Sequence, residues 1–387
     1  MIPLSSPDIT QTEIDAVTAV LRTSRLSLGP ELEAFEQAMA AYHAVPDAVA
    51  VSSGTAGLHL ALLALDMGEG HEVIVPSFAF VAVANAVLYV GATPVFVDID
   101  PVTSNLDPAL VEEAITPRTR AILVVHTFGV PAEMDRIVEI ARAHNLVVIE
   151  DACEAIGAEY DSKRVGRFGD LSVFAFYPNK QITTGEGGCV VAPDPELARR
   201  LRSLRNQGRP AAGANASGTK STGYAEADWF EHIEIGYNYR LGELACALGR
   251  IQLSRIDEIL ALRRDAAERY NALLSGVAGL ELPPSSLPRR SISWFVYVIR
   301  FEIGEEQSAF RDRVQTALEV RGIATGRYFA PIHQQPAWHR RFSAKAGPLP
   351  VTESIARRTL SLPFFNRITS NQQEEVARRL VETMGSV

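Results

Sequence analysis

Apolar positions in the first two hundred residues follow two alternating patterns. Short runs rich in Val, Ile and Leu, typical of buried strands, are separated by segments whose apolar residues recur every three or four positions, as on one face of a helix. This alternation predicts a mainly parallel sheet flanked by helices on both faces. We expect strands at 48–52, 72–76, 93–97, 121–125, 147–150, 172–176 and 188–191, and helices at 56–65, 79–89, 107–114 and 134–144.

The pattern changes in the last third of the chain. A long helical stretch over 241–274 is followed by a strand at 294–301 and by helices that include 306–321, 354–358 and 370–384. At about 150 residues per domain, 387 residues allow two to three domains. We predict a large α/β domain over 1–250 and a smaller C-terminal α+β domain over 251–387. The segment 207–228, rich in Gly, Ala, Ser and Thr, predicts a long mobile loop or flap.

Composition and charge exclude several classes of protein. The formal charge of −9 argues against a nucleic-acid scaffold, which normally carries a basic face. Three separated cysteines and no visible signal peptide favour reduced thiols in the cytoplasm. Residues 73–97 carry no charge and reach membrane-span length, but they contain Pro76, Asn85, Gly91 and Pro94. We therefore interpret this segment as strand, helix and strand, and expect no membrane partner.

A small-residue turn follows the first predicted strand. Ser52-Ser53-Gly54-Thr55-Ala56-Gly57 opens a helix, and helix N-terminal amides beside a hydroxyl form an anion site. The alternative is an ordinary helix cap, because Ser and Thr are common N-cap residues.

Two adjacent acids end another buried strand, where an unpaired carboxylate is costly. Glu150 and Asp151 fit either a structural ion pair or a functional acid. In the functional interpretation, Asp151 keeps a buried heterocyclic nitrogen protonated.

A lysine lies between an aromatic strand and a glycine-rich turn in Phe174-Ala175-Phe176-Tyr177-Pro178-Asn179-Lys180-Gln181-Ile182-Thr183-Thr184-Gly185-Glu186-Gly187-Gly188. A desolvated lysine becomes a nucleophilic amine suited to Schiff-base chemistry, whereas the alternative is a surface lysine in a hairpin. Only four lysines occur in the chain: Lys163, Lys180, Lys220 and Lys345. A phosphate cradle, an acid and an amine are together what pyridoxal 5′-phosphate (PLP) requires.

The ordered motifs resemble one known family. S-S-G-T-A-G-L, P-S-F-A-F-V-A, E-D-A-C-E-A-I-G-A, F-Y-P-N-K-Q-I-T-T-G-E-G-G and G-Y-N-Y-R-L-G-E, with P-I-H and S-L-P near the end, are similar to the DegT/DnrJ/EryC1/StrS family of sugar aminotransferases. The resemblance implies fold type I of the PLP enzymes and a homodimer with active sites at the interface. It implies that Lys180 forms the internal aldimine and moves the proton between Cα and C4′, and that Asp151 pairs with the pyridine nitrogen.

The resemblance also implies roles for residues around the cofactor. Phe80 is expected against the ring and Glu154 near the ring hydroxyl, while the partner subunit supplies Asn238 to the phosphate. Gly54, Thr55 and Ala56 match the phosphate-binding turn. Many relatives have a phosphate-binding serine five residues before the lysine, and here that position is Ala175.

Substrate contacts are expected from His333, in a family-like stretch, and from Arg209 and Arg205 beside the flap. His126 follows an apolar strand and is either near the site or a hydrogen-bonded structural residue. The histidines lack metal-ligand spacing, so no metal is expected. Residues 213–221 resemble a P-loop, but Thr219 interrupts the motif and no strand precedes it.

The implied reaction is transfer of an amino group from L-glutamate, which leaves as 2-oxoglutarate, to a nucleotide-linked keto-sugar. The form of the lysine loop resembles relatives that aminate C4 more than C3. The alternatives are amination of a carbocyclic ketone, sugar dehydration, or a non-catalytic regulatory member of the fold. Dehydrating relatives usually replace the lysine with histidine, so Lys180 argues against that alternative.

Overall fold

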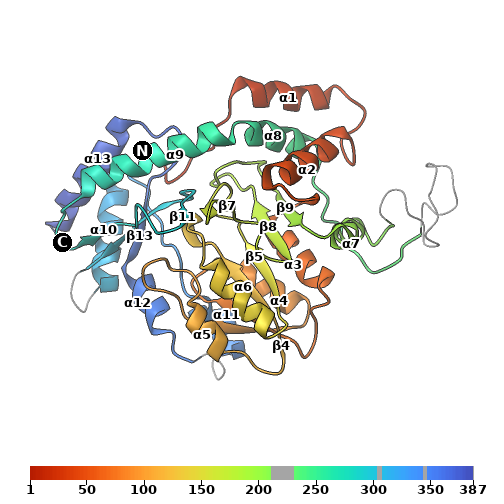
Figure 1. Ribbon diagram of the computed structural model, residues 1–387. Helices are drawn as coiled ribbons and strands as arrows, with labels where there is room; N and C mark the ends of the chain where they lie inside the picture. The colour runs from red at the N-terminus through yellow and green to blue at the C-terminus, as the bar shows by residue number, and fades with distance from the viewer. Residues whose placement is uncertain (211–230, 303–306, 343–346, 387) are drawn as a thin grey trace.

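A computed structural model describes residues 1–210, 231–302, 307–342 and 347–386 (Figure 1). At its centre is a seven-stranded sheet with the order β1-β9-β8-β5-β4-β2-β3. Neighbouring strands are parallel except around β9, which runs antiparallel to β1 and β8. The strands are β1 (Asp47–Val51), β2 (Glu72–Pro76), β3 (Thr93–Val97), β4 (Thr119–Val125), β5 (Val147–Asp151), β8 (Leu171–Ala175) and β9 (Gly188–Ala192).

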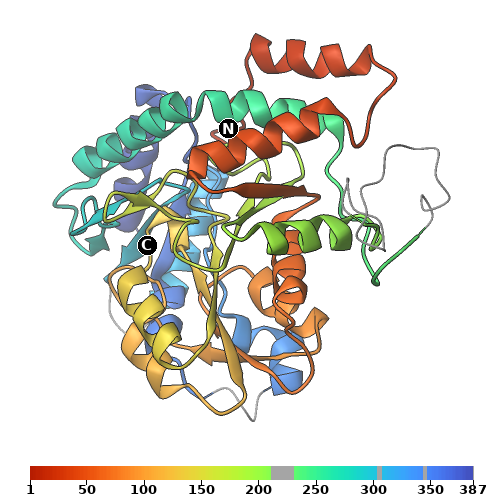
Figure 2. The same ribbon diagram turned by 45° about the vertical axis from the view of Figure 1, so that its right-hand side comes forward.

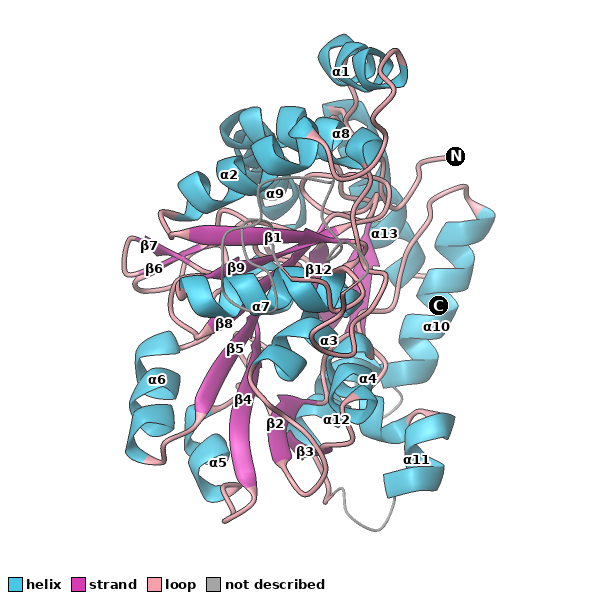
Figure 3. Cartoon of the chain, turned by 90° about the vertical axis from the view of Figure 1, so that its right-hand side faces the viewer, coloured by secondary structure: helices cyan, strands magenta, loops and turns pink. Residues whose placement is uncertain are grey.

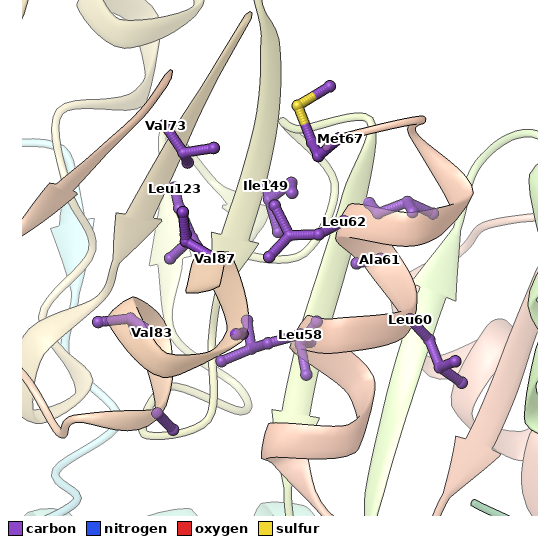
Figure 4. Close-up of a cluster of buried hydrophobic side chains, with 14 of the residues drawn as sticks. Leu58, Leu60, Ala61, Leu62, Met67, Val73, Val83, Val87, Leu123 and Ile149 are labelled. Carbon is purple, nitrogen blue, oxygen red and sulfur yellow. The ribbon is translucent and has the colours of Figure 1, made fainter. Parts of the chain in front are cut away.

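Helices cover both faces of this sheet (Figure 3). One face carries α3 (Gly54–Ala64), α4 (Ala82–Tyr89) and α7 (Pro195–Arg205), and the other carries α5 (Pro108–Glu113), α6 (Met134–Ala143), α2 (Pro30–His43) and α8 (Glu243–Ser254). Successive strand side chains point to opposite faces, so Val73 packs with α3 and α4 while Ile74 packs with α5 and α6. Figure 4 shows Leu58, Val83 and Val87 against the sheet residues Leu123 and Ile149.

The C-terminal part has its own apolar core. A three-stranded antiparallel sheet packs against helices, and its core contains Tyr270, Tyr297, Leu318 and Leu380. Its elements are α9 (Ile256–Leu274), β10 (Leu280–Glu281), β12 (Tyr297–Phe301), α10 (Gln307–Val320), α12 (Pro350–Arg358), β13 (Thr359–Leu362) and α13 (Ser370–Met384).

Shorter elements complete the chain. A small sheet joins residues of the two parts of the sequence. Helix α1 packs across α8 at the outer surface of the molecule (Figure 2). These elements are α1 (Gln11–Leu21), η1 (Thr127–Gly129), β6 (Glu159–Tyr160), β7 (Lys163–Arg164), β11 (Arg290–Ser291), η3 (Ile332–Gln334) and α11 (Pro336–Phe342). Within the described residues, no helix combines the length and apolarity needed to cross a bilayer.

The beginning of the chain packs on its last third. The Ile2 N–H donates to the Gly322 carbonyl (2.8 Å), and the Phe364 N–H donates to the Leu4 carbonyl (2.9 Å). Both termini accordingly lie beside α10 and α13 (Figure 1). Position 250 falls inside α8. The division into domains 1–250 and 251–387 remains a prediction.

The predicted fold class is confirmed, with local differences. The 241–274 stretch is two helices, because Arg255 leaves the helical ladder and its side chain bonds Asp8 and Glu13. The strand expected from 294 begins only at Tyr297, since Trp294 has φ +48°. The sequence patterns missed α1, α2 and α7. The P-loop-like segment and most of the predicted flap lie outside the described residues.

Candidate active site

Segments that follow the parallel strands meet along one edge of the sheet. They are 52–56 after β1, 77–80 after β2, 126–130 after β4, 152–155 after β5 and 176–181 after β8. The three motifs singled out in the sequence therefore lie at the edge where α/β sheets bind ligands.

The Lys180 amine lies between a carboxylate and an aromatic ring. Its side chain is 13% exposed, with Nζ 3.7 Å from Glu154 Oε1 and 3.9 Å from the centroid of the Phe295 ring. The alternative of a surface lysine is wrong. A largely shielded, oriented amine at this position is able to attack an aldehyde.

Glu154 connects the lysine to the turn after β4. Its Oε2 accepts the N–H of Phe128 (2.9 Å), a residue with φ +58°. Burial raises the pKa of Glu154, an effect that Lys180 and the Phe128 N–H partly offset. Glu154 therefore links the lysine amine to the backbone of the turn after β4.

The two adjacent acids of β5 divide the roles that the sequence left open. Glu150 takes the structural role: its Oε2 lies 3.0 Å from His126 Nε2. His126 Nδ1 accepts the N–H of Ala132 (3.0 Å), so the ring donates from Nε2, and His126 is the hydrogen-bonded structural residue. Asp151 has no ion pair within the described residues and accepts the N–H of Cys153 (3.1 Å). Burial raises the pKa of Asp151, which a nearby cation would counteract.

The turn that opens α3 is packed against the other two motifs. A Cβ built on Gly54 would lie 2.8 Å from the Ala175 Cβ and 2.9 Å from the Cys153 Sγ. Ser53 caps the helix by accepting the N–H of Ala56 (3.0 Å). The N–H groups of Gly54 and Thr55 have no acceptor within the helix, because they belong to its first turn. Amides at a helix N-terminus suit a phosphate group.

These features fit PLP. A shielded amine can bind its aldehyde, a buried carboxylate with few hydrogen-bond donors suits its protonated ring nitrogen, and helix N-terminal amides suit its phosphate. The fit rests on this chain's own residues Lys180, Asp151, Gly54 and Thr55.

Two other predicted cofactor residues lie at the surface of the single chain. Phe80 is 64% exposed, whereas its neighbour Phe78 is buried. Asn238 is exposed in a segment whose Tyr239 carbonyl accepts the Ser52 N–H (2.8 Å), next to the α3 turn. Contact of Phe80 with the ring, and of Asn238 with a partner's phosphate, remain predictions.

The predicted substrate residues have different surroundings. His333 is hydrogen-bonded at both ring nitrogens, to Ser77 Oγ (2.7 Å) and to Glu353 (3.4 Å). Arg209 is partly buried near Arg240. Arg205 is 5% exposed and bonds the Glu36 carboxylate and the Ala50 carbonyl. The expectation that it contacts an anionic substrate is therefore wrong.

Sequence reasoning missed residues that surround the lysine. Phe295 lies in the segment predicted as a strand, and Gln181 stands beside Lys180 in a quoted motif. Gln181 is 2% exposed, and its Nε2 donates to the Glu154 carbonyl and to Ser293 Oγ, both at 2.7 Å. The signal available in the sequence was the amide side chain of Gln181 directly after the predicted reactive lysine.

Comparisons with known proteins agree with this geometry. The sequence profile of the DegT/DnrJ/EryC1/StrS aminotransferase family matches residues 7–381. The GDP-perosamine synthase of Caulobacter vibrioides is 39% identical over 385 residues, covering 99% of this chain and 98% of that protein. The dTDP-3-amino-3,4,6-trideoxy-alpha-D-glucose transaminase of Streptomyces venezuelae is 42% identical over 351 residues, covering 90% of this chain and 86% of that protein.

A solved structure shares the fold over nearly the full length. The S. venezuelae DesV structure in complex with a ketimine intermediate has a TM-score of 0.84 and 40% sequence identity, and the match covers 97% of this chain and 95% of that one. Together with the profile match and the motifs at the sheet edge, this similarity confirms the predicted resemblance and class of enzyme: the chain belongs to the DegT/DnrJ/EryC1/StrS aminotransferase family.

Proposed function

We propose that this protein uses PLP to transfer an amino group from L-glutamate to a nucleotide-linked keto-sugar. The observation that carries the proposal is the shielded Lys180 amine, 3.7 Å from Glu154, on the same sheet edge as the buried Asp151. When bound, PLP supplies an aldehyde that accepts amines and a ring that withdraws electrons.

Each residue of this edge has a defined task in the proposal. Lys180 Nζ would hold the cofactor through its aldehyde and would be the group that moves a proton during amino transfer. Asp151 would pair with the protonated pyridine nitrogen, and that positive charge would lower the pKa that burial raises. Glu154 would lie near the ring hydroxyl, and the Gly54 and Thr55 amides would bind the phosphate.

The substrate class is supported by the names of the relatives. One is named for a GDP-linked sugar and another for a dTDP-linked 3-amino sugar. The Thr183-Thr184-Gly185-Glu186-Gly187-Gly188 loop favours amination at C4 over C3. Arg209 and His333 are the proposed sugar-nucleotide contacts, and L-glutamate is the proposed donor.

We further propose a homodimer with shared sites, in the cytoplasm. Exposed apolar side chains support an interface next to the site: Ile235 is 90% exposed, Ile233 53%, Leu26 51% and Phe80 64%. Asn238 follows Ile235 closely in the chain. If a second copy covered this surface, Asn238 of one subunit would lie near the phosphate-binding turn of the other.

The test is a two-step assay of the purified protein. PLP-loaded enzyme should have an absorption band at the edge of the visible region that L-glutamate bleaches. Adding 4-keto or 3-keto nucleotide sugars from a panel should then restore the absorption band, and the band should return fastest with a 4-keto sugar. No bleaching by glutamate would reject the donor, and restoration by none of the sugars would reject the acceptor class.

A further inference from the structure

Four segments around Lys180 are joined into one closed hydrogen-bonded ring. The Phe128 N–H donates to Glu154 Oε2 (2.9 Å), and the Phe128 carbonyl accepts the N–H of Phe295 (3.2 Å). The Gln181 amide closes the ring by donating to the Glu154 carbonyl and to Ser293 Oγ, both at 2.7 Å. We call these five residues the Gln181 brace.

Two groups beside the lysine amine belong to this brace. Glu154 Oε1 lies 3.7 Å from Nζ, and the Phe295 ring centroid lies 3.9 Å from it. The two groups come from distant parts of the sequence, and neither bonds the other directly. Two sets of hydrogen bonds join their segments: residues 128 and 129 bond Phe295 and Ser293 on one side, and Gln181 bonds Glu154 and Ser293 on the other.

The orientation of the Gln181 amide is fixed by its partners. A backbone carbonyl only accepts hydrogen bonds, so the Glu154 carbonyl requires the NH₂ end of the amide. The brace is also closely packed at its centre. A Cβ on Gly129, which has φ +87°, would lie 3.0 Å from the Trp294 nitrogen and 3.1 Å from both the Glu154 carbonyl and Ser293 Oγ.

Resting on the proposed function, we propose that Gln181 is a positioning residue for the reactive lysine. Its amide holds the loop after β5 against residues 293–295, and thereby holds Glu154 and Phe295 against Lys180 Nζ. A displacement of about 1 Å in such a group is enough to slow a reaction on the order of a hundredfold. Gln181 itself touches neither cofactor nor substrate in this role.

The experiment compares Gln181→Leu with a matched control in cofactor-free protein. Gln373→Leu is the control, because Gln373 is 0% exposed and donates to the Ala266 carbonyl in the C-terminal core. We expect Gln181→Leu to capture added PLP at least about tenfold more slowly, with Lys180 trapped by borohydride and identified by peptide mass spectrometry. The control should stay within about twofold of the wild type, and circular dichroism of the cofactor band should change only in Gln181→Leu.

A second readout is independent of PLP. Amide hydrogen exchange at Phe128 and Phe295 should be at least about tenfold faster in Gln181→Leu than in the wild type or the control. Ser293→Ala, which removes one acceptor, should give a smaller change in the same direction and serves if Gln181→Leu does not fold.

The outcomes separate the two proposals. Equal capture and exchange in wild type and Gln181→Leu, or an equal loss in the Gln373→Leu control, would overturn the positioning role. If the wild type captured no PLP, the proposed function would be wrong, and unchanged exchange would then reject the brace as well.

Discussion

Glu150 and Asp151 are neighbours on β5, both buried, yet their surroundings are opposite. Glu150 accepts hydrogen bonds from His126 (3.0 Å), from Ser172 Oγ (3.0 Å) and from the N–H groups of Gly166, Phe168 and Gly169 (each 2.7 Å). Burial alone raises the pKa of Glu150, but these donors lower it to about 2. Asp151 has far fewer donors, and burial keeps its pKa raised.

The alternation of a strand produces this contrast, because successive side chains point to opposite faces. The Glu150 carboxylate, with its full set of hydrogen-bond donors, stabilises the fold. The Asp151 carboxylate has few donors and remains available to a charged ligand. A buried acid is therefore informative about function only once its hydrogen-bond donors are known.

The largest expected effect comes from removing the Lys180 amine, which lies at the same sheet edge as Asp151. Lys180→Ala should lower turnover on the order of 10⁴-fold or more, because proton transfer and attachment of the cofactor both require Nζ. The assay is the glutamate half-reaction followed by absorbance, with borohydride trapping. Lys163→Ala is the matched control, since Lys163 stacks on Phe168 away from the motifs. Normal turnover in Lys180→Ala would remove the lysine from the mechanism.

Asp151→Asn should lower turnover by about 10³-fold while leaving the cofactor-free protein as stable as before, or more stable, at pH 7. The sign follows from the raised pKa: the stability contributed by Asp151 is present at low pH and lost as pH rises through its folded value. Thermal melts of the cofactor-free protein between pH 4 and 8 measure this. A large loss of stability at pH 7 would make Asp151 equivalent to Glu150.

Glu150→Gln should lower stability and leave turnover nearly unchanged, the reverse of Asp151→Asn. The substitution leaves several buried donors without their charged acceptor, which should cost about 3 kcal/mol of unfolding free energy at pH 7. Because the folded pKa of Glu150 is about 2, against 4.5 as the ordinary value, the deficit should shrink as pH falls from 4.5 toward 2. Urea denaturation at several pH values measures it. Turnover per folded molecule should stay within a few-fold, and a loss as large as in Asp151→Asn would contradict the division of roles.

The smallest effect is expected in the α3 turn. Gly54→Ala places a Cβ within 2.8 Å of the Ala175 Cβ, so the turn must shift. PLP affinity should fall by about tenfold, or ~1.4 kcal/mol, measured by fluorescence titration. Adding Ala175→Gly should restore much of it, and failure of that rescue would mean that the clash with Cys153 dominates.

The sequence was sufficient for the sheet and for the chemistry at strand ends. Lys180 and Asp151 were found because strand patterns are local and the loops after parallel strands meet at the carboxyl edge of their sheet. The helix α2 was missed, although Pro30 marks its start, because it ends at Ala44 in a left-handed conformation where glycine is usual.

Contacts between distant segments were beyond the sequence patterns. The role of Arg205 depends on Glu36, which no local pattern brings beside it. The Phe295 ring reaches Lys180 because Trp294 turns the chain out of the expected strand and the Phe295 N–H bonds the Phe128 carbonyl. Such long-range pairings depend on the packing of the whole chain.

The packing of Ile2 and Leu4 on residues 322–364 has a consequence for biosynthesis. Ribosomes add about 5–20 residues per second, so the segment that fixes the N-terminus emerges roughly 10–40 s after Lys180. Phe295 emerges within the same interval. The nascent chain therefore carries its reactive amine before Phe295, whose ring centroid lies 3.9 Å from that amine in the folded protein, has been synthesised.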